Sequence, residues 1–370
     1  MYQPTNSPEI IGHNDYMLPE ILLKLPLQSL ISFKLVSKQW LSLISDNHFL
    51  LRYTNLHPPS LSGLFLVPQQ RNKDNRNQIE YIPFNESRSE AAPCNGLLLT
   101  CHGRKHYVFN PTTEKSKLVP TCPDQFVNKH GVEVVFPRTV ASYYSLAFDP
   151  ELSPHYKIIC IKKSGNTFNI AIYSSDTAIW RLTKSPEFPA PQDIDFSKAI
   201  YCNGAVHWTK RTPRGLYIDI DNELVNYMPE LPRKEQYSCE YFGHSRGRLC
   251  CVFTMEGLHY YEIFEMETDY STWVLKGRVE LDALAFKFPK MEINYWNAHF
   301  KYQCHVLSVV HSNNGKVPKV ILSIPDEIIA HNCKKKTTSK IHDSRLSTQD
   351  RRLWYNVYCV HDYFESLYPL

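Results

Sequence analysis

The sequence predicts an α+β protein with two domains, a small N-terminal three-helix module followed by an all-β, propeller-like domain of about six degenerate blades. Two observations support this prediction. From about residue 17 to residue 51 the apolar residues recur every three or four positions, which is typical of helices with one apolar face. After about residue 60 the pattern changes to short alternating or apolar runs bounded by Gly, Pro, Asn and Asp, which indicates strands and turns.

The composition is that of an ordinary globular protein. The 370 residues are 43% hydrophobic and 21% charged, and 41 Lys and Arg against 37 Asp and Glu leave a net charge of +4, which does not indicate nucleic-acid binding. The eleven cysteines include no C-x-x-C pair, so we expect reduced core cysteines in a cytoplasmic and/or nuclear protein. No apolar run approaches the roughly 20 residues of a membrane helix, and the first ten residues do not resemble a signal peptide.

Three short helices are expected in the N-terminal module. Their apolar stripes are Ile21, Leu22 and Leu25, then Leu30, Phe33 and Val36, then Trp40, Leu41 and Ile44. Pro26 separates the first helix from the second, and Ser37 is placed to cap the third. Helices shorter than roughly 12 to 15 residues are at best marginal in water. These helices must therefore pack on each other, on the rest of the chain or on a partner. Their large apolar residues suit an interface, whereas periodicity alone favours the alternative that they cap the β domain as ordinary core.

The β region contains recurring strand pairs. Five segments are predicted to form strand, polar turn and strand: YVFNPTTEKSKLV, IAIYSSDTAIWRL, YIDIDNELVNYM, YEIFEMETDYSTWVL and IIAHNCKKKTTSKI. In two of them an aspartate precedes a tryptophan by four residues, Asp176 with Trp180 and Asp269 with Trp273, which predicts one structural unit used twice. The turns lie near residues 110, 175, 221, 267 and 333, with a sixth near 70, a spacing that fits four-stranded propeller blades. A β-sandwich or two stacked smaller sheets is the alternative.

The stretch LPEILLKLPLQSLISFKLVSKQWLSLISDNHFL resembles the F-box, the short helical motif that binds the adaptor Skp1 in cullin-RING ubiquitin ligases. The matching residues are Leu25, Pro26, Ser29, Leu30, Phe33, Lys34, Val36, Ser37, Lys38 and Trp40. The remainder resembles the F-box-associated domain common in plant F-box proteins, through FNPTTEK, LAFDP with YKIICI, CNGAVHW, YFGHSRGRL and the final HDYFESL. The resemblance implies an F-box at residues 13–52, a linker at 53–63 and an F-box-associated, β-propeller-like substrate-recognition domain at 64–370.

The function implied by this resemblance is that of a substrate-recognition subunit of an SCF (Skp1-cullin-F-box) E3 ubiquitin ligase. Its partners would be a Skp1-type adaptor, through it a cullin, and an unknown protein substrate, with no nucleic acid, membrane, cofactor, metal or catalytic residue. The residues implied to bind Skp1 are Leu18, Ile21, Leu22, Leu25, Pro26, Leu30, Phe33, Lys34, Val36, Lys38 and Trp40. F-boxes usually have about ten residues between their two Leu-Pro steps, but here Leu18-Pro19 precedes Leu25-Pro26 by only seven, so a shortened first helix is expected.

Other functional classes have weaker support in the sequence. The histidine and cysteine clusters lack the paired spacing of a zinc site; they are Cys101, His102 and His106, and His299, Cys304 and His305. The segment CKKKTTSK at 333–340 suggests either a nuclear-localisation or phosphate-binding patch or the solvated turn of a hairpin, and we favour the turn. The rival functions are a glycan- or small-molecule-binding propeller whose helices are structural, and a propeller enzyme with carboxylates or histidines at its axis.

Overall fold

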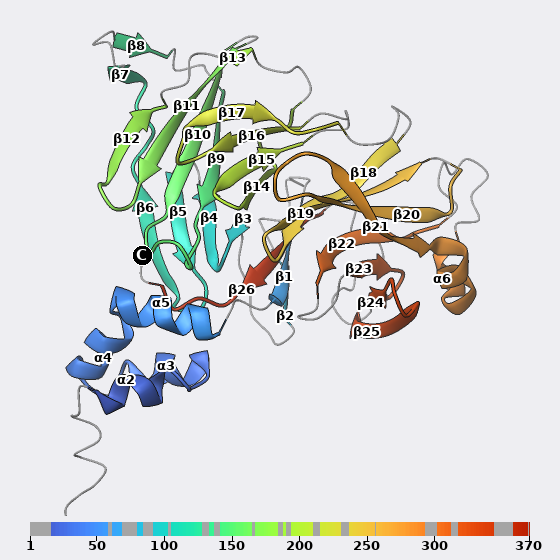
Figure 1. Cartoon of the computed structure of the whole chain (residues 1–370), viewed down its shortest axis with the longest axis horizontal. Helices are drawn as coiled ribbons and strands as arrows, with labels where there is room; N and C mark the ends of the chain where they lie inside the picture. The colour runs from blue at the N-terminus through green and yellow to red at the C-terminus, as the bar shows by residue number, and fades with distance from the viewer. Residues whose placement is uncertain are drawn as a thin grey trace, which may run out of the picture.

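The computed structural model describes residues 16–57, 61–68, 80–83, 92–102, 105–127, 133–136, 141–164, 167–183, 188–189, 194–209, 215–230, 237–255, 257–292, 302–311, 317–343, 358–368 and 370 (Figure 1). The N-terminal module consists of α2 (Met17–Leu22), α3 (Leu27–Phe33), α4 (Lys38–Ile44) and α5 (Asn47–Leu56). It thus has four described helices where three were expected. The fourth helix, α5, was not predicted, although Asp46 caps it: Asp46 Oδ1 accepts hydrogen bonds from the backbone N–H groups of His48 and Phe49, at 3.0 and 3.1 Å.

The other helix boundaries follow the sequence signals. Pro26 precedes α3 in an extended conformation and separates it from α2. Ser37 Oγ accepts a hydrogen bond from the N–H of Trp40 at 3.2 Å, which confirms the predicted cap of α4. Helix α2 has six residues, and Pro19 lies in its first turn, where the missing N–H would have no partner in any case. The first helix is therefore short, as expected.

Five complete antiparallel sheets, four with four strands and one with five, form most of the described β domain. The first sheet contains β3 (Ala92–Cys94), β4 (Leu97–His102), β5 (Lys105–Asn110) and β6 (Lys115–Val119), and the second contains β9 (Ala141–Ala147), β10 (Lys157–Ser164), β11 (Thr167–Ser174) and β12 (Ile179–Leu182). The third contains β14 (Ala199–Cys202), β15 (Ala205–Trp208), β16 (Leu216–Asp219) and β17 (Leu224–Tyr227), and the fourth contains β18 (Tyr237–Ser245), β19 (Arg248–Met255), β20 (Tyr260–Met266) and β21 (Trp273–Glu280). The fifth contains β22 (His305–Val310), β23 (Lys319–Ile324), β24 (Glu327–Asn332) and β25 (Thr337–Asp343). Strand β13 (Phe188–Pro189) pairs antiparallel with β11 as the fifth strand of the second sheet, and β7 (Gln125–Val127) pairs with β8 (Glu133–Val135). Helix α6 (Leu281–Lys287) and the 3-10 turn η1 (Pro289–Met291) follow β21.

A sixth, three-stranded sheet closes the ring. In it β1 (Leu61–Pro68) pairs with both β2 (Glu80–Pro83) and β26 (Tyr358–Phe364), so the two ends of the β region share one sheet. The first strands of the five complete sheets and β26 of the sixth contact each other in the order β3, β9, β14, β18, β22, β26 and back to β3. This closed ring is a propeller and not a sandwich. The described residues form five complete blades rather than about six, because the sixth sheet has three strands and the turn expected near residue 70 lies outside the described residues.

The predicted strand pairs are the outer hairpins of the five complete blades. Each of their turns contains one residue with positive φ: Glu114, Ala178, Glu223, Tyr270 and Lys336, at 53 to 60°. The two tryptophans of the Asp–Trp units occupy equivalent places. The indole N–H of Trp180 donates to the carbonyl of Pro120 at 2.8 Å, and that of Trp273 to the carbonyl of Pro229 at 3.1 Å, in each case just after the last strand of the preceding blade. The turns differ, because residues 175–178 join β11 to β12 and the longer segment 267–272 joins β20 to β21, so the prediction of one unit used twice holds for the tryptophans and not for the turns.

No helix in the described part of the chain is long and apolar enough to span a membrane.

Candidate functional site

Exposed apolar side chains gather on the N-terminal helices. Among the described residues, 16 large apolar side chains are exposed, and seven of these belong to residues 16–57: Tyr16, Met17, Ile21, Leu35, Val36, Leu41 and Leu56. Leu35 and Val36, in the loop between α3 and α4, are 88% and 58% exposed. Such a concentration of apolar surface on a small module is typical of a protein interface.

The eleven predicted Skp1-binding residues differ in burial. Ile21, Pro26, Val36 and Lys38 are exposed; Leu25, Phe33, Lys34 and Trp40 are half-buried; Leu18, Leu22 and Leu30 are buried. Leu30 is 0% exposed and belongs to the apolar core that also contains Leu18 and Leu22. These three leucines can therefore influence a partner only through the fold of the module, whereas the exposed residues can contact one directly.

The rings of Phe33 and Trp40 hold the ends of the α3–α4 loop together. They meet edge to face, with 5.3 Å between ring centroids and an interplanar angle of 79°. Burial, and to a smaller extent the positive charge of Lys115 on β6, lowers the pKa of Lys34. The ammonium group of Lys34 is thus close to the β domain.

Sequence reasoning missed several exposed residues, above all Leu35. Leu35 lies between Lys34 and Val36 and outside the three apolar stripes, so helical periodicity gave no reason to select it. A large apolar residue off the stripe of a short helix was the available signal, because a residue with no place in the core must face solvent or a partner. Leu41 and Met17 were likewise not predicted as site residues.

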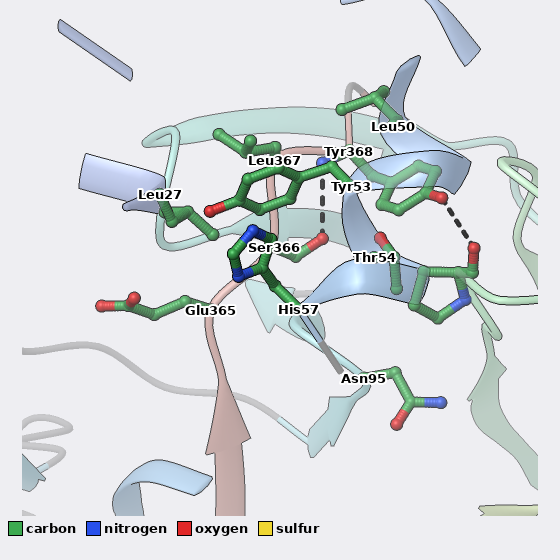
Figure 2. Close-up of a pocket in the computed structure, with 11 residues that line it drawn as sticks. Leu27, Leu50, Tyr53, Thr54, His57, Asn95, Glu365, Ser366, Leu367 and Tyr368 are labelled. Carbon is green, nitrogen blue, oxygen red and sulfur yellow. Dashed lines mark hydrogen bonds between the residues drawn. The ribbon is translucent and has the colours of Figure 1, made fainter. Parts of the chain in front are cut away.

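The last residues of the chain join the helical module to the β domain. One apolar core contains Leu50 and Tyr53 of α5 together with Leu367 and Tyr368. Figure 2 shows these residues around a shared pocket, with α5 on one side and the C-terminal segment on the other. Of residues 53–63, those at 53–56 belong to α5 and those at 61–63 to β1. Tyr53 and Thr54 are buried, and both line the pocket together with the C-terminal segment.

Asn110 holds this C-terminal segment through its fully buried amide. Its Nδ2 donates to the carbonyls of Ser366 and Tyr368, at 3.0 and 2.8 Å, while its Oδ1 accepts from the N–H of Thr112 at 2.9 Å. The hydroxyl of Tyr368 in turn donates to the carbonyl of Pro150 at 2.6 Å (Figure 2). The orientation of the helices relative to the propeller is thus set by buried hydrogen bonds from the first complete blade.

A comparison with known families decides the identity of the helical module. Residues 14–52 match the model of the F-box domain. The chain carries an F-box. It is similar over nearly its whole length to the F-box protein At5g07610 of Arabidopsis thaliana, which is 28% identical over 94% of this chain and 89% of the relative.

Other F-box proteins and several solved structures are also similar. The F-box/kelch-repeat protein At3g23880 of Arabidopsis thaliana is 27% identical over 69% of this chain and 70% of its own. Among solved structures, an oligogalacturonate lyase in complex with manganese has 10% sequence identity and a TM-score of 0.43, covering 74% of this chain and 73% of the lyase. A likeness this distant carries no conclusion about function.

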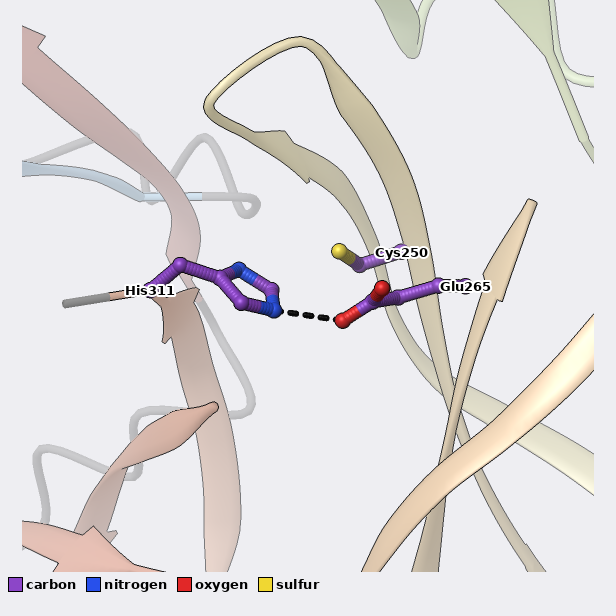
Figure 3. Close-up of side chains that lie close together, drawn as sticks. All are labelled: Cys250, Glu265 and His311. Atoms are coloured by element: carbon purple, nitrogen blue, oxygen red, sulfur yellow. Dashed lines mark hydrogen bonds and ion pairs between the residues drawn. The ribbon is translucent and has the colours of Figure 1, made fainter. Parts of the chain in front are cut away.

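A cluster of possible metal ligands lies away from the F-box, between two blades. Cys250 on β19, Glu265 on β20 and His311, just after β22, bring their ligand atoms within 4.8 Å of one another (Figure 3). His311 Nε2 hydrogen-bonds one carboxylate oxygen of Glu265. The other oxygen lies 3.7 Å from Arg248 Nη1 and 3.9 Å from Lys276 Nζ.

These contacts already compensate the negative charge of Glu265. A divalent cation in the cluster would be repelled by the positive charges of Arg248 and Lys276. We therefore interpret the cluster as an ion-pair network that joins two blades. Of the clusters considered in the sequence, Cys101, His102 and His106 lie on the β4–β5 hairpin, Cys304 and His305 lie at the start of β22, and His299 lies outside the described residues.

Proposed function

We propose that this F-box protein is a substrate-recognition subunit of an SCF E3 ubiquitin ligase, acting in the cytoplasm and/or nucleus. The observation that carries the proposal is the exposed apolar surface of the F-box, with Leu35 and Val36 at the α3–α4 loop and Ile21 on α2. Apolar side chains at the centre of an interface commonly supply most of the binding energy. This surface is the proposed docking site for a Skp1-type adaptor, which links the chain to a cullin.

In this proposal the protein acts by proximity and supplies no catalytic group. The propeller would hold a protein substrate, and the F-box would hold the adaptor, so that a substrate lysine stays near a ubiquitin-conjugating enzyme bound elsewhere in the complex. Holding two reactants together makes a bimolecular encounter effectively intramolecular. The shared core between α5 and the C-terminal segment suits this role, because a fixed orientation of the F-box keeps the two binding sites at a constant separation.

The adaptor site can be tested at Leu35 and Val36. We expect the double change Leu35→Asp, Val36→Asp to weaken binding to a Skp1-type adaptor by about thirtyfold or more, the effect of losing about 2 kcal/mol at an interface hot spot. Co-expression and affinity purification with the adaptor, followed by titration calorimetry, measures this. Because both side chains are exposed, the thermal unfolding midpoint should change little.

The matched control is Leu224→Asp, Tyr227→Asp on β17, where the two side chains are 54% and 55% exposed. This variant should bind the adaptor as the wild type does. Equal binding by the F-box variant, or a wild-type chain that binds no Skp1-type adaptor, would sink the receptor proposal.

A further inference from the structure

The outer turn of the β22–β25 blade differs in charge from the equivalent turns of the other four complete blades. Each of the other four turns contains at least one carboxylate. The turns are at 111–114, 175–178, 220–223 and 267–270, and their carboxylates are Glu114, Asp176, Asp221 with Glu223, and Glu267 with Asp269. None of these four turns contains a lysine. The turn at 333–336 has three consecutive lysines and no carboxylate.

The geometry of this turn does not require lysine. Asn332 Oδ1 accepts hydrogen bonds from the N–H groups of Lys334 and Lys335, at 3.1 and 2.9 Å. Asn110 Oδ1 makes the same pair of bonds, to Thr112 and Thr113, in the turn of the first complete blade. An asparagine before the turn thus forms the same hydrogen bonds whether or not the turn contains lysines. The three positive charges therefore add nothing to the fold of the turn, which presents them to solvent in a fixed conformation.

The carboxylates of the β24–β25 hairpin and of the β23–β24 turn lie at the opposite end of these strands from the turn at 333–336, where they are paired with other lysines. Lys290 Nζ lies 2.7 Å from Asp326 Oδ2. Lys340 Nζ lies 3.1 Å from Glu327 Oε1 and 3.0 Å from Asp343 Oδ2. Within the described ranges of the chain, Lys334, Lys335 and Lys336 are exposed and have no carboxylate partner.

Helix α6 adds a fourth lysine and an aromatic ring to the same edge. Lys287 Nζ donates to Thr338 Oγ1 of β25, which ties the end of α6 to the hairpin. Burial, followed by the charges of Lys287 and Lys336, lowers the pKa of His331, so both ammonium groups are near this one imidazole. The neighbouring Phe286 is 92% exposed. One exposed ring is ordinary by itself, but this one directly precedes Lys287, whose side chain contacts the hairpin.

We propose that this basic edge, defined as Phe286, Lys287, Lys334, Lys335 and Lys336, binds an acidic segment of the protein substrate. The inference rests on the proposed receptor function. Aspartate and glutamate side chains of the segment would pair with the lysines, and an apolar side chain between them would pack on the ring of Phe286. The edge lies on the far side of the molecule from α2–α5 (Figure 1), so a bound segment would leave the F-box accessible.

The chemistry of the edge favours carboxylates over other anions. Arginine, with its planar fork of donors, is the preferred partner for phosphate, and the basic edge contains no arginine. Nucleic-acid binding generally needs a longer basic stripe than four lysines on a chain with a net charge of +4. Lysines on flexible stems suit carboxylates spread along a peptide.

The test is a titration of the full chain against a fluorescein-labelled heptapeptide, Glu-Asp-Glu-Leu-Glu-Asp-Glu, followed by fluorescence anisotropy. Wild-type protein should bind it saturably, and more weakly as salt is raised. Exposed ion pairs are individually weak, so we expect Lys334→Glu, Lys335→Glu, Lys336→Glu together to weaken binding about tenfold or more. The control Lys105→Glu, Lys198→Glu, Lys319→Glu changes the net charge equally at three other exposed lysines and should retain binding. Phe286→Ala should weaken binding of this peptide but not of one with glycine in place of leucine.

Three results would overturn the proposal: no saturable binding by the wild type, equal losses in the two lysine variants, or displacement of the peptide by oligouridylate at lower concentration than by unlabelled peptide. Adaptor co-purification is measured on the same samples. A chain that binds the adaptor but not the peptide refutes the basic edge alone. A chain that binds the peptide but no adaptor refutes the receptor function and leaves the peptide site standing.

Discussion

Leu30 and Val36 belong to the same apolar stripe in the sequence, but only Val36 is accessible to a partner. Leu30 is 0% exposed and Val36 58%. Replacing a fully buried leucine by alanine typically costs about 2–5 kcal/mol of stability. A Leu30→Ala variant that lost the adaptor would therefore report on the folding of the F-box, whereas a Val36 variant reports on the contact itself.

The two tryptophans of the repeated hairpin unit allow a prediction for single residues. Trp273 is buried at 6% exposure, while Trp180 is half-buried. We expect Trp273→Ala to lower the free energy of unfolding of the β domain by about 3–5 kcal/mol, because it opens a cavity and leaves the carbonyl of Pro229 without its donor. Trp180→Ala should cost less. Urea denaturation followed by circular dichroism measures both changes, and a larger loss for Trp180 would contradict the assignment.

At the scale of elements, the C-terminal segment has a role that its position in the chain does not suggest. Its residues 365–368 lie under α5 and accept buried hydrogen bonds from Asn110, so three elements that are distant in sequence depend on one another. The Asn-Gly turn between β3 and β4 also packs against this segment. A Cβ on Gly96 would lie 2.4 Å from Ser366 Cβ and 2.9 Å from the carbonyl oxygen of Phe364.

A comparison of two glycines in equivalent turns isolates the contribution of this contact to stability. Gly96 and Gly204 both follow an asparagine in hairpin turns and have φ of +93° and +73°, but a Cβ on Gly204 would meet nothing within 4 Å. Both Gly→Ala changes should strain the backbone, and Gly96→Ala should cost about 1–3 kcal/mol more because it also displaces the C-terminal segment. Thermal unfolding of the two variants measures the difference. Equal losses of stability would mean that the C-terminal segment moves aside with no effect on the free energy of unfolding.

At the scale of the whole molecule, the pairing of β1 with β26 closes the ring of sheets, and buried side chains fill the contacts between neighbouring blades. Three histidines of the propeller, the fully buried His207 and the half-buried His244 and His305, have lowered pKa values. Burial lowers the pKa of His207 on β15 to about 3, and those of His244 on β18 and His305 on β22 to about 4. These groups are therefore neutral in the folded protein near pH 7.

These histidines make the fold sensitive to acid. In the unfolded chain a histidine has a pKa of about 6.5, so below that pH the unfolded state binds more protons than the folded state. The free energy of unfolding therefore decreases as the pH is lowered. We expect the loss to begin near pH 6.5 and to continue towards pH 4, reaching about 1 kcal/mol for each histidine near pH 5.5. Thermal unfolding at pH 7.5 and 5.5 measures it. His305→Gln should flatten the dependence relative to a control at the exposed His48, and a midpoint that rises on acidification would contradict the assignment.

Features that depend on neighbouring residues could be predicted from the sequence alone. The cap at Ser37, the break at Pro26 and the outer hairpins follow from interactions within a few positions, so periodicity and turn residues were enough to predict them. The motif order within residues 14–52 likewise identified the F-box.

Long-range packing sets which apolar residues face outward and which distant residues meet. It buries Leu30 and leaves Leu35 exposed five positions later. It also joins segments separated by many positions, as in the pairing of β1 with β26, the hydrogen bonds from Asn110 to residues 366 and 368, and the contact of His311 with Glu265. Periodicity describes one element at a time. The solvent exposure of a side chain depends on what the rest of the chain places over it, and that is set by long-range packing.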